Sequence, residues 1–285
     1  HLYMDGAARV SGLRIHSNTT IECLNPGCGF FQSDNSNVPI VCNSKLDHET
    51  IHNRNIALIG GTYNQNCAHQ LHDIPADNEN DLIKGWVMPF KFFGVENLLL
   101  RDVTIRDQST FALLCSNFYH VTMENISIEL PGHEDARNQD GLHFWGPGRF
   151  LTLKNIRGCA GDDFIALAPD ERDEKSDITD VLIDGVALDY ADQAIRLLSR
   201  GCGKLDRVII KNVFGTYRGF GFWINPWFRR NSDGSYNRTG GNFGTIIFDT
   251  INLKPMDANY DYVPPFLFSL GGTIEHLTLR NIYMQ

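Results

Sequence analysis

The sequence predicts an all-β protein in which one chain winds into a single-stranded parallel β-helix, a solenoid. Two observations lead to this prediction. Short runs of β-branched and aliphatic residues, each closed by Asn, Asp, Gly or Thr, recur with roughly 23 to 38 residues between their turn residues, which is the spacing of a solenoid repeat. A second short strand follows most of these turns at a nearly constant offset, and no helical period competes with the two patterns.

The first strand of each repeat is clear at 120–126, where a β-branched and aliphatic run closes at an Asn. The other copies are 95–103, 150–156, 180–186, 207–213, 245–251 and 276–282. The turn position holds Asp102, Asn125, Asn155, Asn212 and Asn281 in five copies. Side chains of this kind hydrogen-bond at turns, so we expect a structural ladder here rather than a functional site.

The second strands are expected at 111–116, 141–146, 164–169, 194–199, 221–225 and 266–270. Four of them begin nine residues after the turn residue and two begin sixteen after it, as in a coil with insertions at one edge. Their apolar residues alternate, as at Leu142 and Phe144, so these side chains face the core and their neighbours face outward. Equivalent residues of stacked coils lie about 4.8 Å apart, so outward columns can be read from the register.

Four columns follow from this register. The column just before the strand contains Thr110, Asp140, Asp163, Gln193 and Phe220, and the column one residue earlier contains Ser109, Gln139, Asp162, Asp192 and Gly219. The two outward columns within the strand contain Leu113, His143, Ala166, Arg196 and Trp223, and then Cys115, Trp145, Ala168, Leu198 and Asn225. Carboxylates, a His, an Arg and two Trp meet in one patch, which is the composition of a carbohydrate cleft.

The carboxylates of Asp140, Asp162 and Asp163 are the predicted catalytic groups. Glycosidic hydrolysis needs one protonated carboxyl to donate to the leaving oxygen and one ionised carboxylate to activate water or to attack the sugar. Three carboxylates within about one coil spacing repel each other, which raises the pKa of at least one and supplies an acid and a base together. The predicted substrate-binding residues are His143, Trp145, Asp192, Gln193, Arg196, Trp223 and Asn225. Arg196 has a second interpretation, as an ion-pair partner of Asp192.

Composition narrows the function further. The chain has 285 residues, 42% of them hydrophobic, and a formal net charge of −9. Nucleic acid is not an expected partner, because its phosphates need a basic face, and no apolar run is long enough to span a membrane. We expect a soluble monomer that uses no cofactor, acts on a polysaccharide or oligosaccharide, and is secreted or periplasmic. One parallel β-helix domain, trimmed at both ends, is expected over 1–285.

Cysteines and loops complete the expectations. Seven cysteines leave at least one unpaired; Cys23 and Cys28 are spaced for a tight disulfide, while the others are expected as small buried hydrophobes. They lack the CxxC spacing of a metal site, so no metal is expected. The loops at 130–139 and 227–230 are candidate walls of the cleft, and the charged run at 170–175 is expected to be a solvated loop.

The two acidic motifs resemble those of a known family. Asn138-Gln139-Asp140 and Gly161-Asp162-Asp163, with 22 positions from Asp140 to Asp162 (162 − 140), are similar to the NTD and GDD motifs of the polygalacturonases, glycoside hydrolase family 28. The resemblance implies a right-handed, pectin-lyase-like parallel β-helix that hydrolyses pectic polymers with inversion. It further implies that Asp162 is the general acid and that Asp140 and Asp163 hold the attacking water.

The chain departs from two other motifs of that family. Ala191-Asp192-Gln193 falls where the family has GHG, and Trp223-Ile224-Asn225 falls where it has RIK. The His and the two cations that grip a galacturonate carboxylate are therefore missing at these places. A neutral or differently charged sugar is indicated, with Arg196 as a substitute cation.

Two alternatives to the hydrolase remain open. A polysaccharide lyase or uronate epimerase uses the same fold and would need a cation beside its base, either Arg196 or Ca²⁺ held by the Asp cluster. A non-catalytic carbohydrate-binding or tailspike-like solenoid would carry the acids as a surface feature only.

Overall fold

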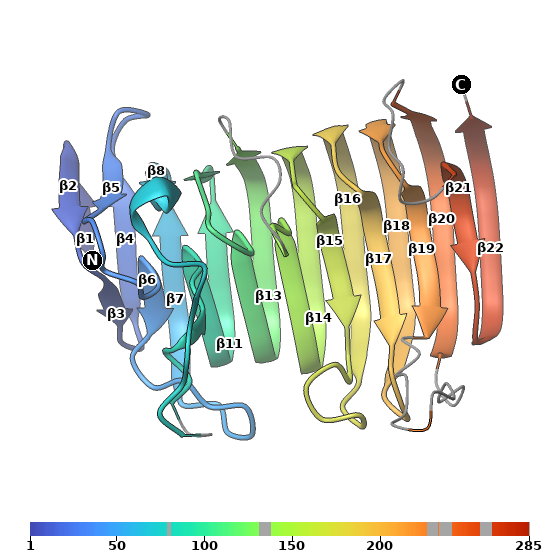
Figure 1. The fold of residues 1–285 in the computed structure, drawn as a ribbon, viewed down its shortest axis with the longest axis horizontal. Coiled ribbons are helices and arrows are strands. Elements are labelled where there is room, and N and C mark those ends of the chain that lie inside the picture. The colour runs from blue at the N-terminus through green and yellow to red at the C-terminus, as the bar shows by residue number, and fades with distance from the viewer. Residues whose placement is uncertain (79–80, 131–137, 227–232, 234–240, 257–263, 285) are drawn as a thin grey trace.

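The structure, a computed structural model, describes residues 1–78, 81–130, 138–226, 233, 241–256 and 264–284. In these residues strands dominate, and the one helix is a short 3₁₀ helix, η1 (Cys67–His69). Coils of strand stack along the long axis of the molecule from the N-terminus to the C-terminus (Figure 1). Among the described strands, every pairing is parallel except that of β9 with β10. The predicted all-β solenoid is confirmed.

The strands fall into an N-terminal group of short elements and a later group of longer ones. The first group is β1 (Leu2–Met4), β2 (Ala7–Val10), β3 (Leu13–Ile15), β4 (Thr19–Cys23), β5 (Gly29–Gln32), β6 (Val41–Asn43), β7 (Asn53–Ile59), β8 (Thr62–Asn64), β9 (Asp73–Ile74) and β10 (Gly85–Trp86). The second group is β11 (Phe90–Arg101), β12 (Thr104–Arg106), β13 (Leu113–Glu129), β14 (Leu142–Cys159), β15 (Asp163–Ala168), β16 (Ile178–Tyr190), β17 (Gln193–Ser199), β18 (Lys204–Tyr217), β19 (Phe220–Pro226), β20 (Asn242–Pro255), β21 (Phe266–Leu270) and β22 (Thr273–Met284).

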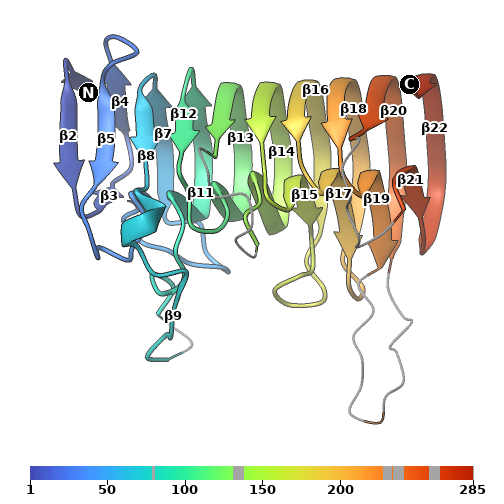
Figure 2. The ribbon, with the colours of Figure 1, turned by 45° about the horizontal axis from the view of Figure 1, so that its top comes forward.

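One face of the solenoid carries the predicted site, and we call it the site sheet. It consists of β3, β6, the starts of β11, β13 and β14 (90–93, 113–116 and 142–145), and β15, β17, β19 and β21. Its inward residues, among them Phe92, Phe144 and Leu167, are fully buried in one continuous core. The segment with β9 and the loop after β15 project on the same side of the solenoid (Figure 2).

The predicted columns are wrong in the coil before Asp140. Leu113 pairs with Leu142 and Leu114 pairs with His143, so Leu114 and Ser116 face outward while Leu113 and Cys115 are fully buried in the core. The residue level with Asp140 is accordingly Phe111 rather than Thr110. Side chains alternate with a period of two, so an error of one residue in the strand offset reverses every side chain of that strand.

The predicted ladder of turn residues is present. Asn125 Nδ2 donates to Asp102 Oδ1 at 2.8 Å, and Asn155 Nδ2 donates to Asn125 Oδ1 at 3.0 Å. All three residues have positive φ, at 59°, 56° and 53°. Asn212 and Asn281 continue the pattern by donating to Asp184 and Asp249 of the preceding coils. Asn and Asp suit this position because their short polar side chains tolerate the left-handed region.

Replacing Asn125 tests the ladder. Asn125→Ala should lower the free energy of unfolding by about 1 kcal/mol more than Asn125→Gly, because both variants lose the side-chain hydrogen bonds but only Ala is strained at positive φ. Urea unfolding of the two variants measures the difference. Equal stability of the two variants would mean that the positive φ at this turn does not determine which residue is favoured at position 125.

The predicted Cys23–Cys28 disulfide is wrong in this structure, where all seven cysteines are free thiols. Cys28 Sγ accepts a hydrogen bond from the Gly6 backbone N–H at 3.0 Å, and Cys23 packs closely beneath Gly61 of the next coil. Each sulfur thus contacts a different neighbouring coil.

In the described ranges no helix has the length and apolar character needed to cross a membrane.

Candidate active site

Two parallel columns on the site sheet bring most of the predicted residues together. The first contains Phe111, Asp140, Asp163, Gln193 and Phe220 on successive coils. The second, three residues further along each strand, contains Leu114, His143, Ala166, Arg196 and Trp223. Since neighbouring parallel strands lie about 4.8 Å apart, acidic and basic side chains meet in one patch.

A glycine allows the coils to meet closely beside the first acid. Gly141 follows Asp140, and its backbone N–H donates to Asp163 O at 2.9 Å. A Cβ at this position would lie 2.2 Å from Phe164 O, so only glycine fits. The glycine after Asp140 therefore allows the backbones of the two coils that carry Asp140 and Asp163 to approach closely.

His143 lies between two carboxylates. Its Nδ1 is 2.7 Å from Asp140 Oδ2, and its Nε2 is 2.8 Å from Glu171 Oε2. Trp145 Nε1 also donates to Glu171 Oε2, at 2.8 Å. Burial alone would lower the pKa of His143, but the carboxylates of Glu171 and Asp140 raise it to about 10. The ring is therefore an imidazolium at neutral pH, with both N–H groups donating to carboxylates.

The buried acids are poised to hold protons. Burial raises the pKa of Asp140 to about 6, although His143 opposes the shift. Burial also raises the pKa of Asp163 well above its ordinary value, against the effect of Arg196. Within the described part of the chain, Asp140 Oδ1 is buried and has no hydrogen-bond partner. A polar group placed there would satisfy it.

Arg196 is held between an acid and an aromatic ring. Its Nη1 is 3.4 Å from Asp163 Oδ2, and its guanidinium carbon lies 4.2 Å from the centre of the Trp223 ring. Asp192, the other partner considered from the sequence, forms an ion pair with Arg218, whose Nη2 is 2.6 Å from Asp192 Oδ1. Arg196 thus offers positive charge directly beside Asp163.

Asp162 is the most accessible of the three predicted catalytic acids. It is half-buried, whereas Asp140 and Asp163 are buried. Its pKa is raised by burial and by the neighbouring Asp192 carboxylate, and Arg196 opposes this. A carboxyl group that has a raised pKa and is still partly exposed is suited to give a proton to a bound molecule.

The remaining predicted residues flank this cluster. Gln193 is buried beside Asp163, and Trp145, Trp223 and Asn225 are half-buried on β14 and β19. The loop residues 131–137 and 227–230, predicted as walls of the cleft, lie outside the described residues. Among the residues that are described, no group of three or more His, Cys, Asp or Glu side chains is arranged to hold a metal ion.

The prediction of a solvated loop at 170–175 is wrong at its first two residues. Asp170 is fully buried and accepts hydrogen bonds from the backbone N–H groups of Arg200, Gly201 and Gly203. Glu171 is half-buried and is the ion-pair partner of His143. Both residues lie in the connection after β15, which does not follow the repeat, so no periodic signal in the sequence identified them.

Arg218 was also missed by sequence reasoning. It donates to Gly161 O at 2.9 Å in addition to its ion pair with Asp192. Arg218 precedes Gly219, just as Ala191 precedes Asp192 and Gly161 precedes Asp162. A further column, drawn one residue before the predicted ones, would therefore have contained it. Arg218 ties the Gly-Asp-Asp turn to the two following coils.

Two curated proteins are similar to part of this chain. An exopolygalacturonase from Platanus acerifolia is 25% identical over 92 residues, which are 32% of this chain and 24% of that protein. A polygalacturonase from Medicago sativa is 30% identical over 80 residues, 28% of this chain and 18% of that protein. The matched segments span a quarter or less of the length of these relatives. No family model matches the chain.

Solved structures resemble the whole solenoid. A polygalacturonase from Erwinia carotovora has a TM-score of 0.62 at 12% identity, covering 98% of this chain and 87% of that one. A mannuronan C-5 epimerase A-module from Azotobacter vinelandii has a TM-score of 0.52 at 10% identity, covering 98% and 89%. Identities this low show the fold alone. Together with the local sequence similarity, they confirm the predicted resemblance: the chain is a divergent, polygalacturonase-like protein with a right-handed, pectin-lyase-like parallel β-helix fold.

Proposed function

We propose that the protein is an inverting glycoside hydrolase that acts on a polysaccharide or oligosaccharide. The observation that carries this proposal is the cluster of Asp140, Asp162 and Asp163 on two adjacent coils, in which all three carboxyls have a raised pKa. Such a cluster contains both a proton donor and an ionised base near neutral pH. A polymeric substrate also fits the predicted secreted or periplasmic location.

Asp162 is the proposed general acid. It is half-buried and faces the surface, and the Asp192 carboxylate helps to keep its proton in place. When the glycosidic bond breaks, Asp162 passes this proton to the leaving oxygen, which would otherwise depart as an unstable alkoxide. Its position agrees with the role implied by the family resemblance.

Asp140 and Asp163 are the proposed base pair. Two buried carboxyls on adjacent coils do not ionise together easily, so the charge on one opposes ionisation of the other. The unsatisfied Asp140 Oδ1 supports water binding at this point. The His143 imidazolium favours the ionised form of Asp140, and Arg196 favours that of Asp163. A water held by the pair loses a proton as it attacks the sugar.

The same geometry supports a sugar contact that differs from the family's. Trp223 and Asn225 occupy the place of the two cations of the RIK motif, and the Trp223 ring is covered by Arg196. We assign Arg196, Trp223 and Trp145 to substrate binding, with Arg196 as the cation nearest the reacting bond. Asp192, paired with Arg218, shapes the site in place of the family's His.

One assay tests the reaction type. The protein is incubated with plant, algal and host polysaccharides and their oligosaccharides, and new reducing ends and unsaturated-uronate absorbance are measured in the same tubes. We expect reducing ends without absorbance, and a product of inverted anomeric configuration by NMR. Absorbance together with reducing ends would replace the hydrolase with a lyase, for which Arg196 beside Asp163 is the favouring observation. Absence of both signals would favour the alternative of a non-catalytic carbohydrate-binding solenoid.

A further inference from the structure

We propose that Lys91 and the aromatic pocket around it form a second saccharide-binding site, which takes an acidic sugar unit of the glycan whose bond is cut at the Asp cluster. The inference rests on the proposed function, because it places this unit in the same bound chain. Its residues are His48, residues of β11, β13 and β14, and the segment that carries β9 and β10, none of which is in the acidic motifs.

The pocket has the size and lining of a sugar site. It has a volume of about 360 Å³, within the usual range for ligand pockets. Trp86, Phe93 and Trp145 contribute aromatic surface to it, and Leu82, Met88 and Leu114 contribute aliphatic surface. Aromatic faces of this kind stack on the apolar face of a sugar ring. The Trp145 and Phe93 rings are themselves stacked, with centres 6.2 Å apart.

Lys91 supplies a cation within this pocket. Its side chain is buried, and its Nζ donates to Ile83 O at 3.3 Å and to Lys84 O at 3.2 Å. An ammonium group has three donors, so one remains for a ligand. In the described ranges no carboxylate forms an ion pair with Lys91, whereas the neighbouring Lys84 is engaged by Asp77 and Asp81.

The surroundings of Lys91 favour an anion. Burial lowers the pKa of Lys91 to about 8, because its ammonium group is largely removed from water. A carboxylate within reach would restore the lost stabilisation through a charge-assisted hydrogen bond. Asp73 and Asp81 also line the pocket, but Asp73 is exposed and Asp81 is paired with Lys84, whereas Lys91 is buried. His48, tilted against Phe93, stays neutral because burial and Arg172 lower its pKa to about 4.

The register connects this pocket to the Asp cluster. Lys91 pairs with Leu114, which pairs with His143, so Lys91 is two coils, about 10 Å, from the imidazolium in the same outward column. Trp145 lines the pocket and also donates to Glu171, the partner of His143. A glycan lying along the solenoid axis therefore contacts the pocket and the acids together.

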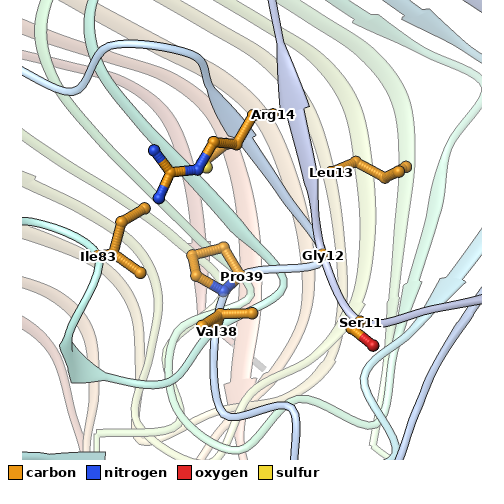
Figure 3. A pocket seen from close by; sticks show the side chains of 8 residues that line it. Ser11, Gly12, Leu13, Arg14, Val38, Pro39 and Ile83 are labelled. Atoms are coloured by element: carbon orange, nitrogen blue, oxygen red, sulfur yellow. The ribbon is translucent and has the colours of Figure 1, made fainter.

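The outward column that contains Lys91 and His143 continues towards the N-terminus, away from the Asp cluster. Lys91 pairs with Cys42, and Cys42 pairs with Arg14, two coils further towards the N-terminus. Arg14 lines another pocket, of about 240 Å³, and its side chain extends across this pocket towards Ile83 (Figure 3). Arg14, Lys91, His143 and Arg196 thus recur at every second coil along one face. Of these four, His143 and Arg196 are already paired with carboxylates of the Asp cluster, so Arg14 and Lys91 are the members of the row proposed to meet acidic units of the glycan.

Binding of defined oligosaccharides tests the site. Asp162→Asn is used to stop turnover, and the affinities of tetragalacturonate, tetramannuronate and their carboxyl-reduced forms are measured by calorimetry. We expect one acidic tetramer to bind about 10-fold more tightly than its reduced form, the effect of one charge-assisted hydrogen bond. Lys91→Met in this background should remove the preference. Lys154→Met, at an exposed position on another sheet, is the matched control.

Trp86→Leu separates the roles of ring and charge. The variant should weaken binding of the acidic and the reduced tetramer alike and leave the ratio of the two affinities unchanged. It also keeps the test usable if Lys91→Met fails to fold. Persistence of the preference in Lys91→Met, or absence of any preference in its parent, overturns the site. If the preference depends on Lys91 but the active protein cuts no glycan, the site stands and the hydrolase proposal falls.

Discussion

Replacing Asp162 with Asn should lower the rate of glycan hydrolysis by at least about 100-fold, the usual contribution of general acid catalysis. Asn is isosteric with Asp but cannot give a proton to the leaving oxygen. The half-buried position of Asp162 means that the fold should be unaffected. The measurement is kcat/KM on the best substrate of the panel, with circular dichroism and thermal unfolding to verify folding.

The pH profile gives this prediction a second readout. Wild-type activity should fall below about pH 6, where Asp140 becomes protonated and the base is lost. It should also fall at higher pH as Asp162 loses its proton, and this second limb should be absent from the profile of Asp162→Asn. Asp189→Asn, at an exposed position away from the site, is the control. Full activity of Asp162→Asn would remove Asp162 from the mechanism and point to Asp163 as the acid.

Replacing His143 with Gln should destabilise the protein by about 3–5 kcal/mol at pH 7, the cost of removing one partner from a buried ion pair. The variant leaves the buried Asp140 and the half-buried Glu171 without the positive charge between them. Chemical unfolding in urea measures the effect. His16→Gln, at an exposed position, is the control and should be close to wild type.

The effect of this substitution should depend on pH in a defined direction. The pKa of His143 is raised from 6.5 to about 10 in the folded state. Its stabilising contribution is therefore fully present below about pH 6.5 and is lost as the pH rises through 10. The difference in unfolding free energy between wild type and His143→Gln should shrink between pH 7 and pH 10. A constant difference would mean that His143 acts through packing and not through its charge.

Repeats made the fold predictable. The turn residues Asn125 and Asn155 mark the repeat because positive φ and stacked side-chain hydrogen bonds restrict which residues fit there. The alternation at Leu142 and Phe144 gave the inward face because strand side chains alternate whatever surrounds them. In the coil before, the strand begins at a different offset from its turn, and so Leu113 was assigned to the wrong face.

The candidate site was predictable only where it follows the repeat. Asp140, Asp163 and Arg196 could be placed side by side because each occupies a definable register position on a paired strand. Glu171 could not, because it lies in a connection after β15 whose path does not follow the period. Its charged neighbours made a solvated loop the more reasonable expectation, yet its side chain is half-buried and contacts His143.

The sequence by itself determined the solenoid, the inward and outward faces of most strands, and the meeting of the three acids, since these depend on short-range periodicity and parallel register. Only the tertiary structure decided the partners of the charges: Glu171 with His143, Arg218 with Asp192, and Lys91 beneath its pocket. The physical reason is that burial sets the energy of a charge, and the burial of these side chains depends on loops and neighbouring coils that no local pattern specifies.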